Sequence, residues 1–75
     1  MRILDTLVRG DRMFCVRQTD GKEEWTVSVL PADYDLEKGI PAGGKSFTTY
    51  AAAKAHQVEL ASKAVAGEKV PFTSQ

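Results

Sequence analysis

Two runs of alternating apolar and polar residues, 13–18 and 23–29, flank a Thr-Asp-Gly-Lys segment. An Asp-Gly pair between such runs strongly indicates a β-hairpin, because a two-residue type I′ turn requires a positive φ at both central positions. A turn closed on Asp20-Gly21 predicts these pairs on one face: Val16 with Trp25, and Phe14 with Val27. On the other face it predicts Arg17 with Glu24, Cys15 with Thr26, and Met13 with Ser28. A slip of one residue would exchange the faces, so the pattern defines one apolar and one mixed face.

A further strand is predicted over residues 2–9, with Gly10-Asp11 as the turn that leads back to residues 13–18. A two-residue turn there predicts Leu7 opposite Phe14 on the apolar face. On the mixed face it predicts Val8 opposite Met13 and Thr6 opposite Cys15. The sequence leaves open whether residues 2–9 pair in this way or lie across the mixed face. Residues 45–47 are a candidate for another short strand.

A helix is predicted from about Tyr50 to Ala66. Thr48 or Thr49 is a suitable N-cap, and Gly67 is suited to the position after the last turn. The residues that a helical wheel gathers on the expected core side are Tyr50, Ala51, Val58, Ala61 and Val65. The residues expected on the opposite, solvent side are His56, Glu59 and Lys63.

These elements predict one α+β domain over residues 1–75. The expected fold is a small antiparallel sheet of about three strands, with one C-terminal Ala-rich helix packed on one face. A chain of 75 residues buries only roughly 60% of its unfolded surface, so a modest stability is expected.

The charge and the cysteine content of the chain limit its possible binding partners and its cellular compartment. The ten basic and ten acidic side chains cancel, so net charge does not favour binding to nucleic acid or to anionic membranes. Cys15 is the single cysteine and cannot form an internal disulfide. No apolar run has the length of a membrane span, and the N-terminus lacks the apolar core of a signal peptide. We therefore expect a cytoplasmic protein without a membrane partner.

Three sequence patterns resemble functional motifs, but the neighbouring residues do not fit those functions. Residues 39–46 match the letters of a phosphate-binding loop, but no buried strand precedes them and no helix begins at their Lys-Ser pair. Residues 33–37 carry alternate carboxylates as a calcium loop does, but Lys38 stands where the turn glycine is required. His56 has no catalytic or metal-ligating partner at a suitable spacing. The sequence therefore predicts no enzyme, no cofactor and no metal site.

The mixed face of the sheet is the predicted binding surface. If the helix covers the apolar face, the mixed face is left to solvent, with the long loop 31–44 beside it. Exposed apolar patches usually mark protein contacts or self-association, and an acidic loop attracts a basic partner. The predicted contact residues are Met13, Cys15, Arg17, Thr26, Ser28, Asp33, Tyr34 and Asp35. The alternative is that the loop, the tail or another strand covers this face, and a homodimer through it is a further hypothesis.

The segment from Trp25 to Phe72 resembles the AP2-like, arm-binding N-terminal domain of phage tyrosine integrases. The likeness rests on the Gly-Lys-x-Phe-x-Thr segment 44–49, the Ala-rich stretch 51–55 and Ala66-Gly67. This resemblance implies a three-stranded sheet that reads DNA through basic and polar residues. The residues that would form the DNA-binding face are Arg9, Arg12, Arg17, Lys22, Thr26 and Ser28.

The layout of the chain is similar to that of small phage anti-CRISPR proteins. An Asp-Gly-Lys hairpin at residues 20–22 and an Ala-Lys-Ala helix at residues 51–55 carry this likeness. It implies a protein that occupies a surface of a host nuclease complex. The leading hypothesis is therefore a non-enzymatic module that binds a host protein or protein complex in the bacterial cytoplasm. A small DNA-binding domain of the integrase type is the alternative.

Overall fold

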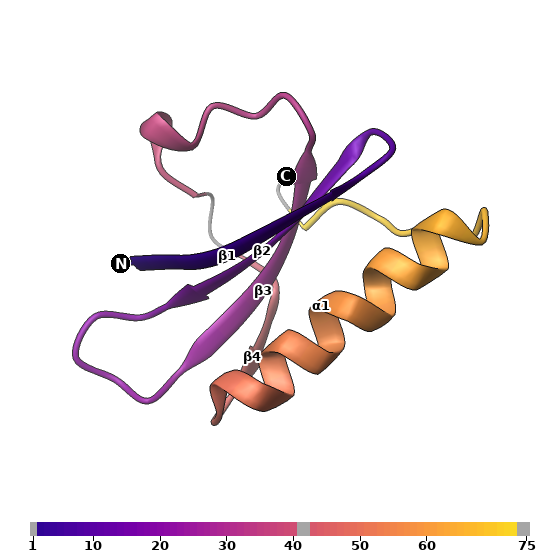
Figure 1. The fold of residues 1–75 in the computed structure, drawn as a ribbon. Coiled ribbons are helices and arrows are strands. Elements are labelled where there is room, and N and C mark those ends of the chain that lie inside the picture. Colours follow the sequence, from indigo (N-terminus) through magenta and orange to yellow (C-terminus); the bar gives the residue numbers. More distant parts are fainter. Residues whose placement is uncertain (1, 41–42, 74–75) are drawn as a thin grey trace.

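The computed structural model describes residues 2–40 and 43–73 of the chain. Its strands are β1 (Arg2–Arg9), β2 (Arg12–Gln18), β3 (Trp25–Pro31) and β4 (Lys45–Phe47), its helix is α1 (Tyr50–Val65), and a 3-10 turn, η1, spans Leu36–Lys38. The strands form one antiparallel sheet in the order β1-β2-β3-β4, and α1 crosses one of its faces (Figure 1). The predicted α+β class with one C-terminal helix is confirmed. The sheet has four strands rather than about three, because residues 45–47 pair with the start of β3.

The β1–β2 hairpin has the predicted register. Leu7 lies opposite Phe14, and a two-residue turn at Gly10-Asp11 joins the strands. Gly10 has a φ of +61°, and no residue other than glycine has a positive φ in the described part of the chain, which fits a type II′ turn with glycine first. The register shifts at Leu4, which forms a bulge between Ile3 and Asp5. Residues 2–9 therefore pair as a strand and do not lie across the mixed face.

The predicted β2–β3 register is wrong by two residues. The observed pairs are Gln18–Trp25, Arg17–Thr26, Val16–Val27, Cys15–Ser28, Phe14–Val29 and Met13–Leu30. A six-residue loop replaces the type I′ turn, and within the Asp-Gly pair only Gly21 has a positive φ. The longer loop removes strand pairs next to the turn. At the other end of the ladder, β2 instead pairs with Val29 and Leu30, which are buried. A shift of two preserves the faces of both strands, because side chains alternate with a period of two.

The helix has the predicted N-cap but not the predicted buried side. Thr49 accepts a hydrogen bond from the Ala52 amide at 3.2 Å. The helical residues that are buried are Ala53, Gln57 and Ala61. Val58 and Val65 were expected in the core, yet they are 46% and 70% exposed, and Tyr50 is exposed as well. Ala51 is exposed too, so of the five residues expected in the core Ala61 alone is buried.

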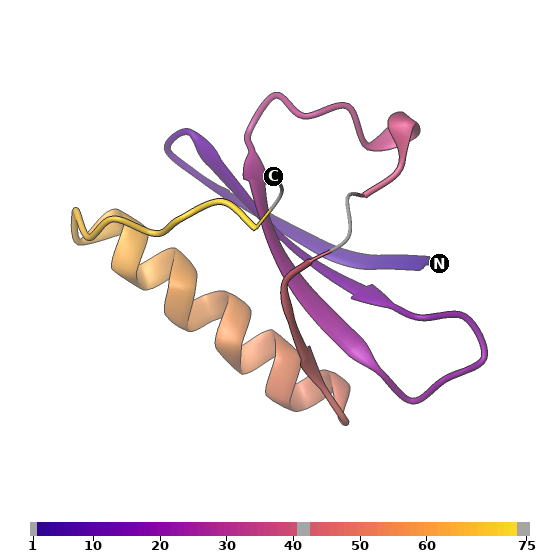
Figure 2. The ribbon, with the colours of Figure 1, turned by 180° about the vertical axis from the view of Figure 1, so that it is seen from behind.

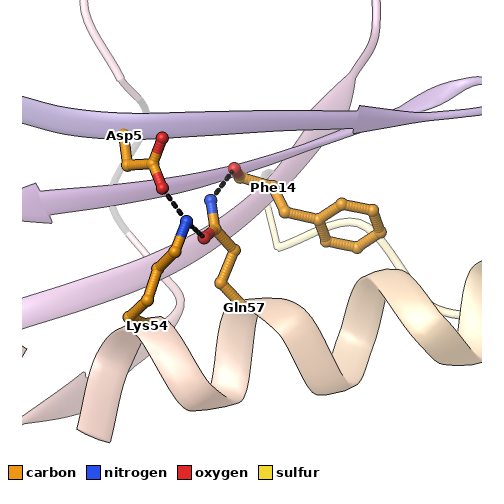
Figure 3. A network of polar contacts seen from close by, with 4 residues as sticks. All are labelled: Asp5, Phe14, Lys54 and Gln57. Atoms are coloured by element: carbon orange, nitrogen blue, oxygen red, sulfur yellow. Dashed lines mark hydrogen bonds and ion pairs between the residues drawn. The ribbon is translucent and has the colours of Figure 1, made fainter. Parts of the chain in front are cut away.

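A polar network explains this rotation of α1 (Figure 3). Gln57 is fully buried, and its Nε2 donates to the Phe14 carbonyl oxygen at 2.7 Å. Lys54 donates to Gln57 Oε1 at 2.9 Å and forms an ion pair with Asp5 of β1. A buried amide needs hydrogen-bond partners, so the network turns Gln57 toward the sheet and leaves Val58 facing outward.

Two layers cover the sheet from opposite sides. On the first face, Phe14 and Val29 pack with Ala61 and Val70, and a neighbouring cluster surrounds Ala53. The tail after α1 also contacts this side, where the Thr73 amide donates to the Val29 carbonyl at 3.0 Å. On the second face lies the long connection from β3 to β4, as the two opposite views in Figures 1 and 2 both show.

Candidate interaction surfaces

The mixed face predicted to be open is covered by the loop between β3 and β4. Tyr34, Leu36 and Ile40 of this loop pack against a buried cluster whose members are Met13, Cys15 and Leu30. The predicted contact residues Met13, Cys15, Thr26 and Ser28 are all buried. The expectation that this sheet face is exposed is therefore wrong for β2 and β3, which the loop covers, whereas Thr6 and Val8 of β1 on the same face are exposed.

The polar residues of this face hold the end of the loop. Thr26 Oγ1 lies 3.0 Å from Ser46 Oγ, and Ser28 Oγ donates to the Gly43 carbonyl oxygen at 3.3 Å. The same carbonyl accepts a hydrogen bond from Arg17 Nη2 at 3.0 Å. Arg17, Thr26 and Ser28 thus fix the return of the chain into β4, which is a structural role that the sequence patterns did not indicate.

Burial of Cys15 beneath the loop leads to a reactivity prediction. Burial raises the pKa of the Cys15 thiol, and the charge of Arg17 opposes this only in part. Less thiolate is then present at neutral pH, and the thiolate is the reactive form. We expect a disulfide reagent to label Cys15 on the order of tenfold or more slowly in the native protein than in urea. A native rate equal to the unfolded rate would show that the loop does not cover this thiol in solution.

The acidic loop, residues 33–37, is presented to solvent on a fixed support. Asp33, Asp35 and Glu37 are exposed, whereas Tyr34 and Leu36 between them point toward the sheet and are partly buried. Asp35 also accepts a hydrogen bond from the Glu37 amide at 3.0 Å, which caps the 3-10 turn. Of the predicted contact residues in this loop, Asp33 and Asp35 are therefore exposed, whereas Tyr34 packs against the buried cluster and is only partly accessible.

A second surface lies between the first strand and the helix, and we call it the β1/α1 groove. It has a volume of about 390 Å³, and its walls are Leu7, Arg9, Lys54, Val58, Ala61, Ser62 and Val65. Val8, between Leu7 and Arg9 on β1, points to the opposite face of the sheet, where it is 48% exposed. Sequence reasoning missed this groove, because the helical wheel placed Val58 and Val65 in the core. The signal for it was Asp5, an acidic residue on the apolar face of a strand that requires a cation from α1.

His56, the single histidine of the chain, lies beside an aromatic ring. The His56 ring lies 5.2 Å from the Phe47 ring, and burial together with nearby Lys45 lowers the pKa of His56, which favours the neutral imidazole. Across residues 2–40 and 43–73, no group of three or more His, Cys, Asp or Glu side chains is placed to hold a metal ion. No helix in the same residues is long and apolar enough to span a bilayer.

A comparison of the chain with models of known protein families, with curated proteins and with solved structures found no match. The class that the coordinates define is a small α+β domain with two candidate contact surfaces. These are the acidic loop on one face of the sheet and the β1/α1 groove on the other.

Proposed function

We propose that this chain is a non-enzymatic binding module that contacts a basic surface of another protein through its acidic loop. The observation that carries this proposal is the alternation within residues 33–37, where carboxylates point outward and Tyr34 and Leu36 pack toward a buried cluster. A loop anchored in this way loses less conformational entropy on binding than a free loop does. Its clustered negative charge steers the encounter toward basic partners.

The partner that fits this chemistry best is a nucleic-acid-binding protein complex of the host. Nuclease complexes hold nucleic acid in positively charged channels, which are surfaces that clustered carboxylates complement. This partner is also the one that the resemblance in layout to phage anti-CRISPR proteins implies. In this proposal the chain is an accessory protein of a phage or mobile element that inhibits a host defence complex in the bacterial cytoplasm.

The alternative, DNA binding of the integrase type, gains less support from the geometry. DNA affinity depends on several basic side chains that reach phosphates. Arg12 is already engaged, because its Nε donates to the Val70 carbonyl oxygen and its guanidinium stacks over Phe72 at 4.5 Å. Arg17 donates to the Gly43 carbonyl oxygen. DNA binding is therefore an outcome of the experiment below, and we do not propose it as a second function.

The double substitution Asp33→Lys/Glu37→Lys tests the proposal. It reverses the charge of the acidic loop and keeps Asp35, whose side chain caps the 3-10 turn. We expect it to reduce capture of a protein partner from nuclease-treated bacterial lysate by about tenfold or more, because like charges replace complementary ones. Quantitative mass spectrometry of the captured proteins measures this loss.

A matched control changes the net charge by the same amount at other positions. Glu23→Lys/Glu68→Lys alters two exposed carboxylates outside the acidic loop and should leave capture intact. Equal loss in both double variants would contradict a specific role for the acidic loop. Recovery of nucleic acid alone, sensitive to moderate salt and indifferent to Asp33→Lys/Glu37→Lys, would favour the integrase-type alternative.

A further inference from the structure

The outer edge of β1 has no hydrogen-bonded neighbour among the described strands. In the order β1-β2-β3-β4 the two edge strands are β1, with eight residues, and β4, with three. A long open edge presents backbone N–H and C=O groups with which another strand can pair. The β1/α1 groove adjoins this edge, so apolar side chains and an open strand edge occur together. On this edge the Val8 carbonyl oxygen accepts a hydrogen bond from Arg9 Nη1 at 2.7 Å within the chain.

The Gly10-Asp11 turn determines which backbone groups of β1 face outward. In a two-residue hairpin the flanking residues, here Arg9 and Arg12, exchange both backbone hydrogen bonds. Such pairs alternate with non-hydrogen-bonded pairs along the ladder. Leu7 therefore also bonds toward β2, whereas Thr6 and Val8 direct their N–H and C=O groups away from the sheet.

We propose that β1 pairs antiparallel with β1 of a second copy of this chain, in the register that places Leu7 opposite the partner's Leu7. Thr6 and the partner's Val8 then exchange backbone hydrogen bonds. Each Asp5, which also forms the ion pair with Lys54 of its own chain, lies opposite the partner's Arg9. Opposite charges directly across a ladder stabilise the pairing, and two-fold symmetry makes the contact twice.

The other symmetric registers lack this charge pairing. Residues whose backbone N–H and C=O groups point away from β2 must lie opposite such residues of the partner strand. Because these residues alternate along β1, every symmetric register places one residue directly opposite its own copy. A register centred on Thr6 places Asp5 opposite the partner's Leu7 and brings the bulge at Leu4 into the ladder. A register centred on Val8 places Arg9 opposite the partner's Leu7 and shortens the ladder. Of the three, the Leu7-centred register alone matches acid with base.

The helix contributes the second part of this interface. A two-fold axis perpendicular to the sheet keeps both α1 helices on the same face of the joined sheet. The side chain of Leu7 lies in the β1/α1 groove with Val58 and Val65. The partner's Leu7 extends this apolar surface across the axis, so that the most exposed valines of α1 become part of a shared cluster. The second copy thus supplies apolar neighbours for Val58 and Val65, which the orientation of α1 leaves exposed within one chain.

Analytical ultracentrifugation of the full chain, from micromolar to millimolar concentration, tests this dimer. We expect a monomer–dimer equilibrium, and we expect Arg9→Glu to raise its dissociation constant by about tenfold or more, because a glutamate then lies opposite the partner's Asp5. Lys22→Glu makes the same change of charge in the β2–β3 loop and should leave the equilibrium unchanged. Residue-resolved hydrogen exchange should show that the Thr6 and Val8 amides gain protection as concentration rises.

A backbone variant provides a second arm. Val8→Pro removes an outward-facing N–H that the monomer does not use, so it should abolish dimerisation while circular dichroism retains the native signal. A chain that stays monomeric throughout, a dimer indifferent to Arg9→Glu, or Thr6 and Val8 amides indifferent to concentration would each overturn the proposal. A monomer in which Val8→Pro prevents capture of another protein would assign the edge to a foreign strand instead. The acidic loop lies on the opposite face, so Asp33→Lys/Glu37→Lys tests the proposed function independently.

Discussion

Replacing Gly44 by alanine should lower the free energy of unfolding by about 3–5 kcal/mol, since backbone strain and overpacking act together. Gly44 has a φ of +110°, a region that residues with a Cβ rarely adopt. A Cβ at this position would overlap the Val27 carbonyl oxygen and lie 3.1 Å from Ser28 Oγ. The obstacle is the backbone of a central strand, which cannot move aside without breaking the ladder. Urea denaturation followed by Trp25 fluorescence measures the loss.

Gly39→Ala is the matched control for this substitution. Gly39 also has a positive φ, +84°, but a Cβ there would meet no atom within 4 Å. It should therefore cost only the backbone strain, about 1–3 kcal/mol. The difference between the two variants isolates the close approach of the loop end to β3. Equal losses would contradict a close approach of Gly44 to the Val27 carbonyl oxygen.

The features that the sequence predicted correctly depend on residues close together in the chain. A two-residue turn with glycine first determined the β1–β2 register, and a threonine side chain determined where the helix begins. The division of β2 and β3 into two faces was also predicted, because alternation survives a shift of two residues. Local chemistry thus sufficed wherever one turn or one cap decides the geometry.

The β2–β3 register depends on distant contacts that the turn does not determine. The preference of an Asp-Gly pair for a tight turn is local, and it does not depend on the rest of the chain. Here the opposite end of the ladder decides, because the observed register buries Val29 against Phe14 and Leu30 against Met13. Burial of such apolar side chains contributes about 1.5–3 kcal/mol each, which exceeds the preference for one turn type.

The sequence of the covering loop itself indicates that one of its sides packs. Residues 33–37 alternate acidic and apolar side chains, and alternate carboxylates are also a feature of calcium loops. The same alternation is typical of a segment that packs one side on a core and exposes the other. Tyr34 and Leu36 are the packed side, together with Ile40 farther along. The strands alone could not show that the mixed face is covered, since the covering residues lie in the connection between β3 and β4, which contains only one short 3-10 turn.

Gln57→Ala should lower the free energy of unfolding by about 2–5 kcal/mol, a range typical of truncating a fully buried side chain of this size. Gln57 is wholly inaccessible to solvent, and its amide joins the Phe14 carbonyl oxygen of β2 to Lys54 of the helix (Figure 3). The alanine leaves both a cavity and polar groups that lose their partner. Denaturation monitored by circular dichroism at several urea concentrations measures the change.

Two further variants separate the cavity from the hydrogen bonds. Gln57→Met nearly conserves the volume and removes the amide, so it should cost about 1–3 kcal/mol. Lys54→Met removes the ion pair between the partly exposed Lys54 and Asp5 side chains, which contributes at most about 1 kcal/mol. It also leaves the buried Gln57 Oε1 without its donor, so the total cost should be about 1–3 kcal/mol. If Gln57→Met were as stable as the wild type, the network would contribute nothing to the rotation of α1. The small side chains of Ala53 and Ala61, which let the helix lie close to the sheet, would then set that rotation and expose Val58 and Val65 by themselves.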